Sequence, residues 1–559
     1  MIERKCNGHK DIMYSSADNT SYLMSDVLPS QTYSFAMKTW CITSDKDCES
    51  IFSNSIKYTT KDNNICLVKD PRDRSNSETY SFHGINHPRS SVLINRADER
   101  GRTILMQECK RGNTHNVNKL IIKGADISKE DNDGNSSLHL ACQYGHLGIV
   151  KRLLESGILN INCTNKDGKS PFYLCCMGGH ILVVEYLIRI KCDINKADKN
   201  GISPIMTACG QGNFEITKRL IKHFVEINST DNKGNALMHY ACLCGNICIA
   251  DLLINKGCNV DNPNNDGETP LIVACGKGYL SIVKLLINRF ANIYITDNKG
   301  RSSFYWSCVN GNYRLVKFLI GKDCNINMSA NDGTTPLIAA CLNSNVQTAD
   351  ILIQGDASIN SANNRGETPL FWACFTGANY IVSLLINLKC NIDKGNNSGI
   401  TPLVAACLQR NKQTVEILIK GGADIKSTNE RGETPLFLAC GVGDSDIVNF
   451  LINGGSEIEK VDNNGNTPFM NACSINSLKI VQILIKRKVN INQTNFQGQT
   501  AFYWACRFNA VDVVKYLIDE DCCNLNQPDN DGNTPYWVAS IYEYETIKNI
   551  LIKKGADKM

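Results

Sequence analysis

The stretch GETPLFWACFTGANYIVSLLINLKCNID, from Gly366 to Asp393, is one copy of a unit that recurs along most of this 559-residue chain. Its first glycine serves as a marker, and an equivalent glycine follows every 33 residues, apart from two steps of 34. A fixed period of this length indicates a stacked array of similar units rather than a globule with one core. The fourteen markers are Gly101, Gly134, Gly168, Gly201, Gly234, Gly267, Gly300, Gly333, Gly366, Gly399, Gly432, Gly465, Gly498 and Gly532.

The start of each copy predicts a helix. Thr or Ser stands two residues after the marker in thirteen copies, with Ala236 as the exception, and Pro follows in nine copies. Thr is a good N-cap, and Pro suits the first helical position because its missing N–H would have no partner there. A second apolar run follows a small residue such as Gly377. Helices of two or three turns are too short to be stable alone in water, so each copy must pack against the next.

The pattern resembles the ankyrin repeat. Two quotable matches are SSLHLACQYGHLGIVKRLLESG, Ser136 to Gly157, and ETPLIVACGKGYLSIVKLLIN, Glu268 to Asn288. The resemblance implies an all-α solenoid of about fourteen stacked repeats over residues 98–559, each with a β-turn finger and two antiparallel helices. It also implies a structural, hydrogen-bonding role for His139, which stands at the histidine of the family's core motif.

The two ends of the chain depart from the period. Residues 1–97 are rich in Ser, Asn, Asp and Lys, which predicts a mostly irregular or disordered segment. An apolar stretch there, Tyr33 to Ile42, is a candidate helix or a candidate docking segment for the first repeat. In repeat 1, Gln107 and Glu108 replace an apolar residue and Ala, which predicts a polar outer face and an N-terminal cap. In repeat 14, Ser540 and nearby lysines predict a C-terminal cap.

Cysteine is unusually common, with 27 residues, and half of them form a column. Neighbouring helices pack about 8–10 Å apart, whereas a disulfide needs Cα atoms within about 4.4–6.8 Å. We therefore expect small buried hydrophobes rather than disulfides or metal ligands, in a reducing compartment, the cytoplasm or the nucleus. The column, eight residues after the marker, is Cys109, Cys142, Cys176, Cys209, Cys242, Cys275, Cys308, Cys341, Cys374, Cys407, Cys440, Cys473 and Cys506.

The sequence offers no sign of catalysis. All nine histidines precede residue 240, and Gly168-Lys169-Ser170 has Cys163 where the first glycine of a phosphate-binding loop should stand. We expect no catalytic, cofactor-binding or metal-binding residues, and hence no enzyme. The net charge of +4 gives no nucleic-acid signal. The sequence contains no run of about 18 apolar residues, so no membrane span is predicted.

Odd and even repeats alternate in two respects. Five and six residues after odd markers stand aromatic pairs such as Tyr305-Trp306 and Phe371-Trp372, whereas even repeats have aliphatic or small residues such as Ile338-Ala339. These aromatics either fill the interfaces between repeats or anchor a partner. The finger tips also alternate, because Lys or Arg precedes most odd markers while Asp or a neutral residue precedes most even ones. That row is either a solvated edge of mixed sign or a set of cations for an acidic partner.

These patterns predict a protein–protein interaction scaffold or adaptor, monomeric, whose partner proteins bind along a concave groove and the finger tips. Two alternatives remain open: an elastic or structural spacer, and a substrate-recognition adaptor that docks through residues 1–97. Family geometry places the two residues after the column cysteine in the groove. The predicted partner-binding residues are Tyr144, Phe375, Arg507 and Phe508 in the groove and Lys233, Lys299, Arg365 and Arg431 at the finger tips.

Overall fold

The structure, a computed structural model, describes residues 94–557 except residue 224, together with the backbone of five short strands earlier in the chain. It divides into two compact units, Met1–Ser90 and Ser91–Met559. In the first, β1 (Ile2–Cys6), β2 (His9–Met13) and β3 (Ser34–Met37) form an antiparallel sheet with the order β2-β1-β3. Two further strands, β4 (Asn64–Ile65) and β5 (Tyr80–Ser81), pair with each other.

The candidate helix over Tyr33 to Ile42 is wrong where it can be checked. Ser34 to Met37 is an extended strand whose backbone pairs with β1, from Ile2 opposite Met37 to Lys5 opposite Ser34. Hydrogen bonds from a distant strand therefore replace the local bonds of a helix. The rest of the prediction for residues 1–97 lies outside the described residues.

The second unit is an all-α solenoid in which each repeat contributes two helices. The first helices are α2 (Ile104–Arg111), α4 (Ser137–Gln143), α6 (Pro171–Gly178), α8 (Pro204–Gly210), α10 (Leu237–Cys244), α12 (Pro270–Lys277), α14 (Ser303–Asn310), α16 (Pro336–Leu342), α18 (Pro369–Thr376), α20 (Pro402–Leu408), α22 (Pro435–Val442), α24 (Pro468–Ser474), α26 (Ala501–Arg507) and α28 (Pro535–Ile541).

The second helices are about one residue longer on average and also begin and end in register. They are α3 (Thr114–Ile122), α5 (Leu147–Leu154), α7 (Ile181–Arg189), α9 (Phe214–Lys222), α11 (Ile247–Asn255), α13 (Leu280–Asn288), α15 (Tyr313–Ile320), α17 (Val346–Gln354), α19 (Asn379–Asn387), α21 (Lys412–Lys420), α23 (Ser445–Asn453), α25 (Leu478–Lys486), α27 (Val511–Asp519) and α29 (Glu545–Lys553).

The predicted helix starts are confirmed. In α18, for example, Thr368 is the N-cap, its hydroxyl accepts a hydrogen bond from the Phe371 N–H at 3.2 Å, and Pro369 is the first helical residue. The marker glycine must be glycine for two reasons. Gly366 has φ +79, in the left-handed region, and a Cβ there would lie 2.8 Å from the backbone nitrogen of Asn397 in the next finger.

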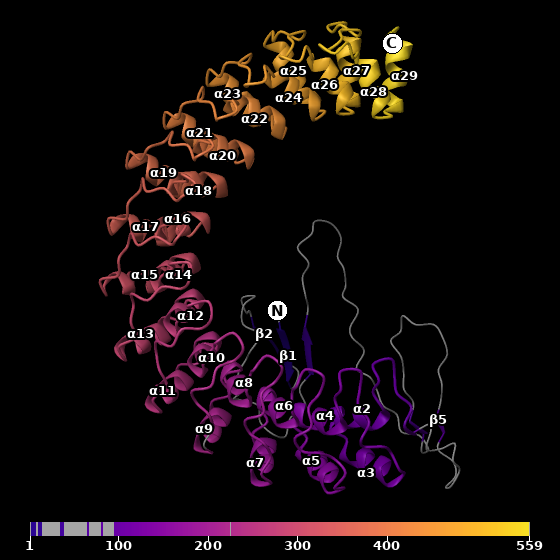
Figure 1. Ribbon diagram of the computed structural model, residues 1–559, viewed down its shortest axis with the longest axis vertical. Coiled ribbons are helices and arrows are strands. Elements are labelled where there is room, and N and C mark those ends of the chain that lie inside the picture. Colours follow the sequence, from indigo (N-terminus) through magenta and orange to yellow (C-terminus); the bar gives the residue numbers. More distant parts are fainter. Residues whose placement is uncertain are drawn as a thin grey trace. The chain divides into compact units, whose positions relative to one another are not determined.

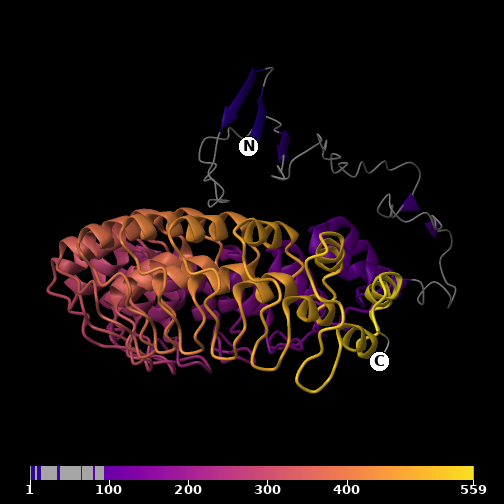
Figure 2. The same ribbon diagram turned by 90° about the horizontal axis from the view of Figure 1, so that it is seen from above.

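Successive repeats bury one another. Each first helix packs on its own second helix and on the first helices of the neighbouring repeats, so that the fourteen first helices form one row. The second helices form a parallel row, and the finger loops project from one edge of the array (Figure 2). This arrangement is the one that helices too short to stand alone require.

The cysteine column lies between the two rows, as predicted. All thirteen column side chains are completely buried, and Ser540 is partly exposed in the final repeat. Repeat 1 differs from the expectation of an exposed polar face. Glu108 is buried, and its carboxylate accepts hydrogen bonds from Arg111 at 2.6 Å and from the Asn116 side chain at 2.9 Å. A neighbouring cation and an amide therefore allow an acid at a position that is apolar elsewhere.

Candidate partner-binding surface

The fingers form a rigid comb. The backbone N–H two residues before each marker donates a hydrogen bond to the carbonyl of the preceding finger tip, as from Asn331 to Lys299 and from Asn397 to Arg365, both at 2.8 Å. The same contact recurs between every pair of neighbouring fingers from Arg100 to Asn530. The tip residues therefore stand at a fixed spacing, whatever their side chains are.

Asparagine side chains add a second ladder to this comb. Six consecutive fingers carry Asn two residues before the marker, and each amide donates to a backbone carbonyl of the preceding finger at 2.9 to 3.1 Å. The residues are Asn232, Asn265, Asn298, Asn331, Asn364 and Asn397. Sequence reasoning missed this ladder, although the recurrence of Asn at one register position was the signal for it.

The four predicted finger-tip cations are all exposed. Lys233, Lys299, Arg365 and Arg431 use their backbone carbonyls in the comb, whereas their side chains form no ion pair with any described residue. By contrast, Asp167 is paired with Lys169 at 3.0 Å. The cations are thus held in a row by the backbone, with their charges directed to solvent.

The groove face is defined here as the side of the first helices that carries the residues six, nine and ten positions after each marker. The aromatics six positions after odd markers lie at its finger side and are half-buried. Trp306 donates its indole N–H to Asp297 at 3.2 Å, and the Arg301 guanidinium lies 4.3 Å from the centre of its ring system. Trp504 donates to Gln499 at 3.0 Å. The indole nitrogen of Trp372 is buried and has no hydrogen-bond partner.

These aromatics also fill the space between repeats. A Cβ built on Gly276, nine positions after the preceding marker, would lie 3.7 Å from the Trp306 ring. A Cβ on Gly210 would lie 3.1 Å from Tyr240. In these two cases a large residue at position six faces glycine in the repeat before it, which supports the packing interpretation of the alternation. The rings at position six remain half-exposed, so they also form part of the solvent-facing surface of the groove face.

The four predicted groove residues lie at the far side of this face and reach solvent. Phe375 is 37% exposed, and its ring centre lies 5.3 Å from that of Trp372. Tyr144 is exposed beneath the Lys110 ammonium, which lies 5.3 Å from the ring centre. Phe508 is exposed next to Trp504, with the partly exposed Arg507 guanidinium 5.8 Å from its ring.

Sequence reasoning passed over aliphatic residues in the same register. Leu342 and Leu408, nine positions after their markers, are exposed on either side of Phe375 in the neighbouring repeats. The signal was the register itself, because Phe375 had already been assigned to the groove. An apolar side chain thus appears in three consecutive repeats, from α16 to α20.

Burial is the main cause of the pKa shifts of the buried histidines and cysteines. Burial lowers the pKa of His139 to about 4, and burial raises the pKa of the Cys209 thiol to about 12. His139 is therefore a neutral hydrogen-bonding residue, in keeping with its expected structural role, and the thiol is not a nucleophile at neutral pH. No group of three or more metal-ligating side chains occurs among the residues that the structure describes.

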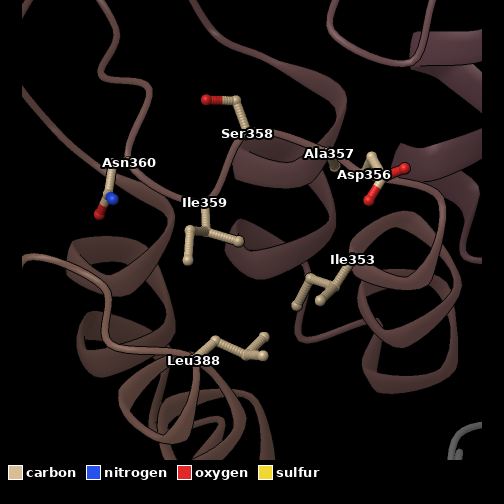
Figure 3. Close-up of a pocket in the computed structure, with 7 residues that line it drawn as sticks. All are labelled: Ile353, Asp356, Ala357, Ser358, Ile359, Asn360 and Leu388. Carbon is tan, nitrogen blue, oxygen red and sulfur yellow. The ribbon is translucent and has the colours of Figure 1, made fainter.

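The cavities of the array are shallow. Figure 3 shows an open hollow of about 410 Å³ beside the end of α17 and the loop that follows it. A second hollow lies at the same register of repeat 11, around Ile458, so these hollows reflect the repeat geometry. The lining of the first contains no basic residue, and the charged residues that line the second, Glu457, Glu459 and Lys460, are all exposed. The first is lined by Ile353, Asp356, Ala357, Ser358, Ile359, Asn360 and Leu388. No helix in the described part of the chain has the length and apolar character needed to cross a bilayer.

Comparison with known proteins agrees with this geometry. A family model described as "Ankyrin repeats (3 copies)" matches the chain in overlapping windows that together extend over residues 88–559. Among solved structures, the chain is similar to the crystal structure of the human ASB11 ankyrin repeat domain, with 23% identity and a TM-score of 0.37. That match covers 39% of this chain and 98% of the human domain.

Proposed function

The chain belongs to the ankyrin repeat family, and from that premise we propose that its array is a scaffold or adaptor that binds a partner protein along the groove face and the finger tips. Ankyrin repeats are in general protein–protein interaction modules, and their proteins are typically not enzymes. A solenoid offers a long surface on which many weak contacts add up.

One observation carries the proposal. Lys233, Lys299, Arg365 and Arg431 are exposed, without an ionic partner among the described residues, on a comb that fixes their spacing. Because the backbone of the tips is already ordered, only the side chains must be ordered on binding, and cations in a regular row attract an acidic partner. The exposed aromatics of the groove face, such as Phe375, belong to the residue types that dominate binding energy at interfaces.

A reducing compartment, the cytoplasm or the nucleus, is part of the proposal. The cysteines that the structure describes are all unpaired, and most of them are buried. Unpaired thiols in this number suit a compartment that keeps them reduced.

The test is affinity capture with the intact chain and a fourfold charge reversal of the finger tips, K233E, K299E, R365E and R431E. The matched control reverses four exposed lysines at the ends of second helices, Lys222, Lys256, Lys486 and Lys553, so that the net charge changes equally. We expect the finger variant to lose captured proteins that the control retains. Capture of the same proteins by all three chains, with groove variants such as Phe375→Ser also unchanged, would refute the proposal.

A further inference from the structure

Two features of the binding surface, one in repeats 9 to 12 and one in repeats 8 to 10, overlap in repeats 9 and 10, and together they restrict what can bind there. The first is the charge of the finger tips. Asp266 and Asp332 stand between the earlier cations, whereas Arg365 and Arg431 alternate with the neutral tips Ser398 and Asn464. A negatively charged chain lying along the comb therefore meets tip cations that alternate with acidic tips as far as Asp332, and with neutral tips from Arg365 to Asn464.

The second feature is the groove cluster, defined as Leu342, Trp372, Phe375 and Leu408. Leu342 is 40% exposed, and Phe375 and Leu408 are each 37% exposed, so each repeat from α16 to α20 offers one apolar side chain. The next residue along each helix is polar: Asn343, Thr376 and Gln409. The apolar surface is therefore a stripe only one side chain wide.

The width and spacing of this stripe favour a thin, extended ligand. Neighbouring repeats stand about 8–10 Å apart. A polyproline II chain rises about 3.1 Å per residue with three residues per turn, so it returns to the same face every 9.3 Å or so. A β-strand returns every two residues, at about 6.6 Å, and fails to match. An α-helix is about 10–12 Å wide, which is too broad for a stripe bordered by amides.

Trp372 adds a further reason for an extended backbone. Its equivalents Trp306 and Trp504 donate to Asp297 and Gln499, whereas the Trp372 indole nitrogen has no acceptor. The carbonyls of a polyproline II chain are free, whereas those of a helix are used internally. The nitrogen is covered in the unbound array, so donation to a ligand requires the indole to turn.

We infer that the groove cluster and the finger tips Arg365 and Arg431 bind an extended, polyproline II-like segment of the partner, with an apolar residue at every third position and carboxylates about six residues apart. The inference rests on the proposed function and names the partner's chemistry. Arg431 stands beside the exposed Glu430, whereas Arg365 has neutral neighbours, so Arg365 makes the larger contribution.

The test is selection of random peptides of about sixteen residues, displayed on phage, against the intact chain. We expect enriched sequences with apolar residues three apart and acidic residues six apart. A synthetic peptide of that consensus should bind about ten-fold more weakly to the Arg365→Glu and Phe375→Ser variants. The matched controls Lys222→Glu and Leu182→Ser, which are exposed on the second helices α9 and α7 and lie outside the groove face and the finger tips, should bind it like the unaltered chain. In a chain labelled with ¹⁵N-tryptophan, the peptide should shift the indole resonance that the Trp372→Phe variant lacks.

Three outcomes overturn the inference: enriched peptides with apolar residues seven apart, which indicate a helical ligand; equal loss of binding in the second-helix controls; and no enrichment at all. Each leaves the proposed function standing if the fourfold finger variant still loses captured proteins. If that variant and the groove variants capture everything the unaltered chain does, the proposed function fails as well.

Discussion

Lowering the pH from about 7.5 to about 5 should loosen repeat 2 while leaving the C-terminal half of the array unchanged. The reason is His139 in α4, which is buried and joined to two neighbours. The Ser136 N–H donates to Nδ1 at 3.1 Å, which leaves Nε2–H to donate to the Lys169 carbonyl of the next finger at 3.2 Å. The contact with Ser136 requires the neutral ring, since a second proton on Nδ1 would remove the acceptor, whereas Nε2–H donates to Lys169 in either state.

The magnitude follows from the pKa of His139 in the two states. Burial lowers it to about 4 in the folded chain, against about 6.5 in the unfolded chain. A lowered folded pKa means that the stabilisation is fully present above about pH 6.5 and is lost as the pH falls towards 4. At pH 5 protonation of His139 stabilises the unfolded state by about 2 kcal/mol relative to the folded state. Below pH 4 the free energy of unfolding has fallen by about 3 kcal/mol.

Hydrogen exchange read by mass spectrometry resolves the change repeat by repeat. After correction for intrinsic exchange rates, 2 kcal/mol corresponds to a loss of protection of about thirty-fold in α4 and α5. Repeat 5 should change in the same direction, because burial also lowers the pKa of His239. Repeats 9 to 11 contain no histidine and are the internal control.

Titration of carboxylates should not obscure the effect of His139 on protection at pH 5. Despite burial, hydrogen bonds from neighbouring residues hold the pKa of Asp231 and that of Asp529 below the ordinary value of 3.8, so their contributions are lost only at lower pH. The variant His139→Gln should abolish the pH dependence of repeat 2. The reasoning is refuted if repeat 2 keeps its protection at pH 5, or if the Gln variant loses protection with pH as the unaltered chain does.

Three further predictions concern stability. Gly276→Ala should stabilise the array by about 0.5–1 kcal/mol, because a helical Cβ there meets Trp306 at an ordinary contact distance. Gly210→Ala should stabilise it less, because its Cβ would lie too close to Tyr240. Urea unfolding of both variants measures the difference. Asn298→Ala should cost at most about 1 kcal/mol and raise exchange at its own finger and the preceding one, because one amide rung is lost. Above about pH 9 the array should lose stability progressively, because burial raises the pKa of the column thiols and only the unfolded chain can ionise them. Unfolding followed by circular dichroism measures this, and a stability that stays constant to pH 10.5 would contradict it.

The sequence could predict every feature that a single repeat decides within itself. Thr368 and Pro369 begin a helix through contacts two or three residues away, and Gly366 takes its left-handed φ because of the finger it belongs to. The burial of the column cysteines followed from helical periodicity alone. The exposure of Phe375 followed from its place one residue beyond that column.

What failed, or went unseen, depended on a second segment of the chain. Ser34 to Met37 is a strand because β1 pairs with it, and Glu108 is buried because its carboxylate pairs with Arg111 in the same helix and accepts a hydrogen bond from Asn116 in the next helix. The Leu342 and Leu408 stripe became visible only when neighbouring repeats were placed side by side. Propensities and periodicities describe one helix, whereas these features belong to pairs of elements.

The sequence by itself determined the repeat, its helices, its caps and the number of copies, because these rest on hydrogen bonds and apolar faces within about thirty residues. Only the tertiary structure decided how copies meet: the asparagine ladder along the fingers, Trp306 over Gly276, and Trp372 without an acceptor. The physical reason is that each contact depends on two residues about 30 positions apart, whose sizes and hydrogen-bonding groups must match across an interface that no single copy contains.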